Sequence, residues 1–157
     1  MTADERRQWL QRLVGDWTFE SEMSPTPDAP AGKYRGTERV RSLGDAAVVC
    51  ETTWEIPVGG THITTMTLGY DTAKERFVGT VAGDAMNHTW MYDGEMDPGG
   101  TRLLLETEGP SYEDQGVFTK YVDTSELLGD DERVLRSTFL GRDGAWHQFM
   151  VSRYRRA

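Results

Sequence analysis

From Trp17 to the end of the chain, short runs of alternating polar and apolar residues follow one another, separated by turn residues. Alternation with a period of two is typical of β-strands that bury one face. No segment between these runs is long enough for the helix of a βαβ unit. A series of about ten short strands must stack into two sheets or close, and closure removes exposed edges. The sequence therefore predicts one all-β domain over residues 1–157, an up-and-down antiparallel β-barrel.

The predicted strands are joined mostly by tight turns. Asp143-Gly144 is the strongest hairpin signal, because Asp-Gly favours two-residue turns between strands. The expected strands are residues 17–23, 34–42, 47–56, 62–70, 76–82, 86–92, 101–107, 116–122, 133–140 and 146–154. The segment 24–32 contains three prolines and is predicted to be a long loop.

The first residues predict a short helix over residues 3–13. Thr2 and Glu5 have the spacing of a capping box. Trp9 and Leu13 lie four residues apart and share one face of the helix. We expect this apolar face to close one end of the barrel.

Charge and cysteine content exclude several classes of function. The net charge of −9 argues against nucleic acid or an anionic membrane surface as a partner, since both require basic patches. The single cysteine, Cys50, forms no internal disulfide, and its position on a predicted inner face indicates an inert thiol. No apolar run is long enough for a transmembrane helix, and the charged N-terminus has no signal core. We expect a cytoplasmic protein.

Gly15-Asp16-Trp17, between the predicted helix and the first strand, resembles the Gly-x-Trp signature of the calycins, the superfamily of lipocalins and fatty-acid-binding proteins. Within it, the chain is most similar to an uncharacterised bacterial family, a domain of unknown function with a hairpin like Gly69-Tyr70-Asp71. The resemblance implies a lipocalin-like barrel in which an arginine of the last strand covers Trp17. Arg153 is the first choice for this structural role and Arg155 the second. Nitrobindins, which bind haem, carry glycines after the tryptophan, where this chain has Thr18-Phe19-Glu20.

Alternation also predicts which side chains face the interior. If Arg153 faces Trp17, the inner face of the last strand includes His147, and the other two histidines, His62 and His88, also fall on inner faces. The candidate ligand-binding residues are Trp54, His62, Met66, Tyr70, His88, Trp90, Tyr92 and His147. They are predicted to lie below a mouth opposite Trp17 that the 24–32 loop borders.

Three functions remain open from the residues alone. In the first, the barrel binds a small, largely apolar ligand in the cytoplasm. In the second, it binds haem or a metal, or catalyses a reaction, through the inward histidines. In the third, its own side chains fill it and it acts through a protein interface, for example as a homodimer. No catalytic motif, cofactor or metal site is predicted. The acidic residues Glu106, Glu108, Glu113, Asp114 and Asp123 are expected to form a solvated face.

Overall fold

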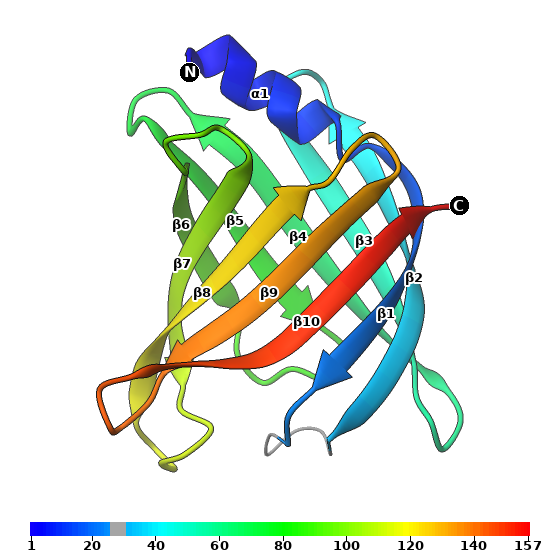
Figure 1. Ribbon diagram of the computed structural model, residues 1–157, viewed down its shortest axis with the longest axis vertical. Helices are drawn as coiled ribbons and strands as arrows, with labels where there is room; N and C mark the ends of the chain where they lie inside the picture. The colour runs from blue at the N-terminus through cyan, green and yellow to red at the C-terminus, as the bar shows by residue number, and fades with distance from the viewer. Residues whose placement is uncertain (26–30) are drawn as a thin grey trace.

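A computed structural model, which describes residues 1–25 and 31–157, shows a closed barrel with a helix across one end (Figure 1). Each strand pairs antiparallel with its neighbour in the chain, and β1 pairs with β10 to close the barrel. The elements are α1 (Ala3–Gln11), β1 (Gly15–Met23), β2 (Gly32–Leu43), β3 (Ala47–Glu55), β4 (Thr61–Asp71), β5 (Arg76–Gly83), β6 (Trp90–Met96), β7 (Arg102–Pro110), β8 (Phe118–Leu127), β9 (Glu132–Leu140) and β10 (Trp146–Arg156). The predicted fold class is confirmed.

The N-terminal helix begins with the predicted capping box. The Glu5 amide donates to Thr2 Oγ1 at 3.1 Å, and the Thr2 amide donates to Glu5 Oε2 at 2.6 Å. The helix ends at Gln11, two residues before the predicted end. The next residues tighten into a turn, since the amides of Leu13 and Val14 donate three residues back.

The α1 end of the barrel is fully packed. Helix α1 lies over β3 and β4, and Trp9, Leu10 and Leu13 of the helical segment are at most 4% exposed. Inward side chains of the barrel meet them from below, including Val48, Phe77 and Leu103, each 0% exposed. The expectation that the helix closes one end is confirmed.

A buried ion pair lies just inside this packed end. Arg133 and Glu38 are in contact, and Thr52 Oγ1 donates to Glu38 Oε2 at 2.7 Å. The Arg133 guanidinium lies 4.8 Å from the centre of the Trp17 ring and 3.7 Å from that of Tyr154. The charge is therefore enclosed by a carboxylate and two aromatic faces.

The predicted contact between Arg153 and Trp17 is wrong. A register shift between Gln148 and Met150 interrupts the alternation of β10, so Ser152 and Tyr154 are buried and Arg153 faces out. A β-bulge adds one residue to a strand and reverses the faces beyond it. The second choice, Arg155, is also exposed and lies 3.1 Å from Glu132. Two other arginines cover Trp17: Arg133, and Arg156 at 4.3 Å.

β6 begins four residues later than predicted, at Trp90. Residues 84–89 form the connection from β5 and not the start of the strand. The Asp84 amide donates to the Ile63 carbonyl and the Met86 amide to the Gly83 carbonyl, which bends the chain away from the ladder. His88 therefore lies in a connection and not on the inner face of a strand.

Candidate functional site

The end of the barrel opposite α1 carries the connections β1–β2, β3–β4, β5–β6, β7–β8 and β9–β10 (Figure 1). We call this the open end. Trp17 lies at the other end, where its Nε1 donates to the Leu13 carbonyl at 2.8 Å. The predicted loop 24–32 connects β1 to β2 at the open end, but its residues 26–30 lie outside the described part of the chain. The prediction that it borders a mouth is untested.

Inward side chains near the open end are less buried than those under α1. Trp54, Met66, Trp90 and Tyr92 point inward by strand alternation but are only partly buried. Trp54, Met66 and Tyr92 pack against the buried core of the barrel. The burial of inward side chains thus decreases from the α1 end toward the open end.

Four of the predicted ligand-binding residues line this half. In the ladders, Met66 lies opposite Val81, and Val81 opposite Trp90, so all three share one row across β4, β5 and β6. Trp54, on the adjacent strand β3, donates from Nε1 to Thr64 Oγ1 at 3.2 Å. Tyr92 follows Trp90 by two residues and faces the same side.

The Trp90 ring is fixed against the neighbouring strand. A Cβ atom on Gly109 would lie 2.2 Å from a ring carbon of Trp90, so no other residue fits at position 109 with the ring in place. The Tyr121 ring lies 4.9 Å from that of Trp90, edge to face. Trp90 therefore forms a rigid part of the wall.

A polar group lies among these rings that sequence reasoning missed. Tyr92 Oη donates to Asp123 Oδ2 at 2.5 Å, and Ser137, opposite Asp123 in the β8–β9 ladder, also donates to this carboxylate. Burial raises the pKa of Asp123, and the two hydrogen bonds partly oppose that rise. Burial, together with the nearby Asp123 charge, raises the pKa of Tyr92.

Asp123 corrects the expectation of a solvated acidic face. Glu106, Glu108 and Glu113 are exposed as expected, whereas Asp123 faces the barrel interior between the buried residues Tyr121 and Ser125. The predicted strand ended at residue 122, one position too early to include it. A longer predicted strand would have included Tyr121, Asp123 and Ser125 on one face, and this alternation indicates that Asp123 points inward.

Further aromatic side chains extend the wall toward the open end. The rings of Tyr112, Tyr121, Phe139 and Phe149 lie 5.2 to 6.3 Å from one another. Tyr121 Oη donates to the Pro110 carbonyl at 2.5 Å, which ties the end of β7 to β8. None of these four rings is among the predicted ligand-binding residues.

The three histidines all lie at the open end, each with its own partners. His62 Nδ1 is 3.3 Å from Asp84, and His147 Nε2 is 2.9 Å from Asp143. His88 Nε2 is 3.1 Å from the Glu108 carbonyl, and its ring lies 4.7 Å from that of Trp90. The structure thus places them around the rim and not together in the interior.

Tyr70 lies away from the predicted ligand-binding residues of the open half. It is 8% exposed under α1, 5.1 Å from the Phe77 ring, and the Arg6 guanidinium of the helix lies 5.3 Å from its ring. It belongs to the packed end of the barrel.

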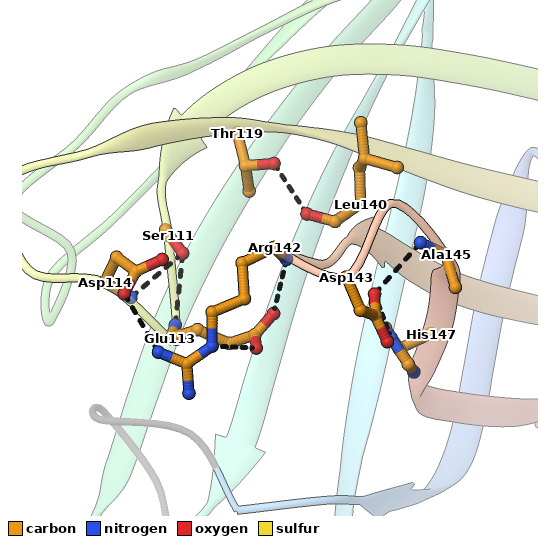
Figure 2. A network of polar contacts seen from close by, with 9 residues as sticks. All are labelled: Ser111, Glu113, Asp114, Thr119, Leu140, Arg142, Asp143, Ala145 and His147. Carbon is orange, nitrogen blue, oxygen red and sulfur yellow. Dashed lines mark hydrogen bonds and ion pairs between the residues drawn. The ribbon is translucent and has the colours of Figure 1, made fainter.

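Two connections at the open end are tied by one arginine. Figure 2 shows Arg142 of the β9–β10 connection reaching Glu113 and Asp114 of the β7–β8 connection, at 3.4 and 3.2 Å. Ser111 Oγ accepts from the amides of Glu113 and Asp114, and Asp143 accepts from the Ala145 amide beside His147. These contacts hold the rim above the aromatic wall.

Two cavities of about 530 and 580 Å³ lie along β1, β2 and β10. Both are lined by Glu20, Arg35 and Arg153, whose side chains are exposed. None of the predicted ligand-binding residues lines either cavity. Neither cavity therefore coincides with the predicted ligand-binding residues.

Potential metal ligands and the single thiol were located in the described residues. Among residues 1–25 and 31–157, no three His, Cys, Asp or Glu side chains gather as metal ligands would. Cys50 is 1% exposed, and burial together with the Glu38 charge raises its pKa, so its thiolate is strongly disfavoured. The described helix is too short to span a membrane.

Solved structures with similar folds cover nearly the whole chain. Rv2717c from M. tuberculosis matches with a TM-score of 0.67 and 14% identity over 96% of each chain. The S-type phycobiliprotein lyase CPES from Guillardia theta matches with a TM-score of 0.57 and 14% identity, over 98% of this chain and 95% of that one. A redesigned β-barrel, mFAP0, bound to DFHBI, matches with a TM-score of 0.51 and 10% identity, over 93% and 100%. At these identities the similarity shows the fold alone.

Sequence comparison adds a family but no activity. A family model described as a protein of unknown function (DUF1579) matches residues 2–156. A search of curated proteins gave no match.

Proposed function

Because the chain belongs to the DUF1579 family, whose description assigns no function, we propose from the barrel itself that it binds a small, largely apolar ligand in its open half. The unequal burial of inward side chains carries this proposal. Leu10, Val48 and Phe77 are 0% exposed at the α1 end, whereas Met66 and Trp90 keep accessible surface near the open end. A barrel of eight strands is just filled by its side chains, and more strands leave room inside.

The lining suits a flat or aromatic ligand. Trp54, Trp90 and Tyr92 present rings, Met66 presents a flexible thioether, and polar groups are few. We place His62, His88 and His147 as contacts at the rim, because each lies at the open end. Tyr70 supports the closed end and is not part of the proposed contact surface.

Two structural neighbours are consistent with this role. The redesigned barrel was solved with DFHBI bound, and the other neighbour is a phycobiliprotein lyase. We also expect the protein to act in the cytoplasm, where a lone thiol such as Cys50 stays reduced.

The test enlarges one inward side chain so that it occupies the space proposed for the ligand. A neutral naphthalene dye that shifts its emission in an apolar site is titrated into wild type, Met66→Trp and Met91→Trp. Met66 faces the interior, whereas Met91 is 65% exposed on the outer face of β6, so the second variant is a matched control. We expect wild type and Met91→Trp to bind saturably and Met66→Trp to lose binding.

The stability of Met66→Trp separates a hollow barrel from a filled one. In a hollow barrel the larger ring is accommodated, and the unfolding midpoint stays near that of wild type. In a filled barrel, overpacking destabilises the fold by about 1–3 kcal/mol. Destabilisation of that size, together with no dye binding to wild type, would reject the proposal.

A second candidate is a protein interface at the open end. Val58, Val117, Phe118 and Trp146 are 95%, 52%, 61% and 49% exposed there. A group of exposed apolar side chains is typical of interaction surfaces. Light scattering of wild type and Phe118→Ser tests this candidate. A wild-type dimer that the substitution dissociates supports the interface. A monomeric wild type contradicts self-association through it.

A further inference from the structure

The interior carboxylate Asp123 lacks a cation to balance it. In the described part of the chain, no ion pair involves Asp123, and its polar contacts are the hydroxyl groups of Tyr92 and Ser137. The buried guanidinium of Arg133 is already paired with Glu38. A carboxylate offers about four acceptor positions, so two hydroxyl donors leave capacity for a further donor.

A second polar group nearby has no partner. Thr107 is 8% exposed, and its Oγ1 is buried without a hydrogen-bond partner among the described residues. In the β7–β8 ladder, Thr107 lies opposite Tyr121. Leu105, two residues before Thr107, lies opposite Asp123. Alternation therefore directs Thr107 to the same interior face as Asp123. A buried hydroxyl without a partner is costly, and such groups usually indicate a missing water or ligand.

We infer that Asp123 and Thr107 form the polar end of the interior site and that its ligand is an organic amine, an apolar or aromatic body carrying an ammonium group. This inference rests on the proposed function and specifies its ligand class. An ammonium has three N–H donors and no acceptor. One N–H reaches the free acceptor positions of Asp123, and a second reaches Thr107 Oγ1. The apolar body then lies against Trp90 and Tyr92.

Charge and solvation favour this class over others. An isolated buried carboxylate is costly, and a cationic ligand offsets that cost by forming a charge-assisted hydrogen bond. A carboxylate ligand such as a fatty acid would instead meet a like charge. The net charge of −9 acts in the same direction at long range, because it attracts cations to the protein.

The experiment compares three ligands with one ring system. Naphthylethylamine, naphthylethanol and naphthylacetic acid compete with the neutral naphthalene dye for wild type, Asp123→Asn and Thr107→Val. The control variant, Asp45→Asn, removes one negative charge from an exposed turn at the closed end. For wild type and the control we expect the amine to bind about tenfold more tightly than the alcohol, and the acid to bind most weakly.

The two substitutions in the site have distinct expected results. Asp123→Asn brings the affinity for the amine down to that for the alcohol and leaves the alcohol within about twofold of its wild-type affinity. Thr107→Val weakens the amine by about threefold and keeps the shape of the side chain. If Asp123→Asn fails to fold, Thr107→Val and the ligand ranking in wild type still decide the matter.

The outcomes separate this inference from the proposed function. Equal affinities for amine and alcohol, or tightest binding of the acid, overturn the amine inference, while saturable dye binding that Met66→Trp abolishes still supports the interior site. Failure of the dye and of all three ligands to bind overturns both.

Discussion

The guanidinium of Arg156 lies 4.3 Å from the centre of the Trp17 ring, joining the last strand to the first. The same group donates to three carbonyls, those of Val14 at 2.7 Å, Arg12 at 2.8 Å and Asp130 at 2.7 Å. Arg156 thus ties together the end of α1, the start of β1 and the β8–β9 connection. It also occupies the space beside Gly15, where a Cβ would lie 2.5 Å from Nη1.

Replacement of Arg156 by alanine is therefore expected to destabilise the fold by about 2–3 kcal/mol, through loss of the ring contact and the charged hydrogen bonds. Arg153→Ala is the matched control, because Arg153 is exposed on the outer face of the same strand. Its effect should stay within about 0.5 kcal/mol. Urea denaturation of both variants measures the difference, and equal effects would contradict the assignment.

Trp9 gives a test of how firmly α1 is docked. It is 4% exposed, so Trp9→Ala should cost about 3–5 kcal/mol. Its Nε1 is buried without a partner in the described residues, so Trp9→Phe, which keeps an aromatic ring, should cost clearly less. Trp146→Ala, at a tryptophan that is 49% exposed, controls for ring removal alone. A midpoint for Trp9→Ala close to that of wild type would mean that the helix is not docked.

The architecture was accessible from the sequence because it depends on patterns that are local. Alternation and turn residues identified all ten strands, and a capping box identified the helix. The arginine over Trp17 was not accessible in the same way. A β-bulge at residues 148–150 reverses the faces of β10, and no turn residue or glycine in the sequence marks it.

The site was only partly predictable for a related reason. The inward direction of Trp54, Met66, Trp90 and Tyr92 follows from alternation, whereas Asp123 is expected on a solvated face because acidic side chains are usually exposed. The predicted strand ends at residue 122, whereas β8 continues to Leu127 and includes Asp123, whose hydrogen bond reaches Tyr92 two strands away. Such long-range contacts leave no local pattern.

The buried pair of Glu38 and Arg133 predicts strongly non-additive substitutions. Glu38→Leu or Arg133→Met alone leaves a buried charge without its partner and should cost about 3–5 kcal/mol. The double variant Glu38→Leu with Arg133→Met removes both charges and should be more stable than the sum of the single effects implies. A double-mutant cycle by urea denaturation measures the coupling. Additive effects would show that the two charges do not depend on each other.

Asp123 and Asp143 should respond to pH with opposite signs. Burial raises the pKa of Asp123 in the folded state, so between the unfolded value of about 3.9 and the raised value the folded state binds more protons than the unfolded one. Wild type should therefore lose stability relative to Asp123→Asn as the pH rises through that window.

The pKa of Asp143 is lowered, first by the Ala145 amide and then by His147. The contribution of Asp143 to folding stability is therefore present above the unfolded pKa and is lost as the pH falls. The stability of wild type relative to Asp143→Asn should accordingly increase with pH near that value. Urea midpoints of the three proteins from about pH 3 to pH 8 measure both differences. A flat or rising difference for Asp123→Asn would show that the carboxyl is not buried in the barrel as the structure places it.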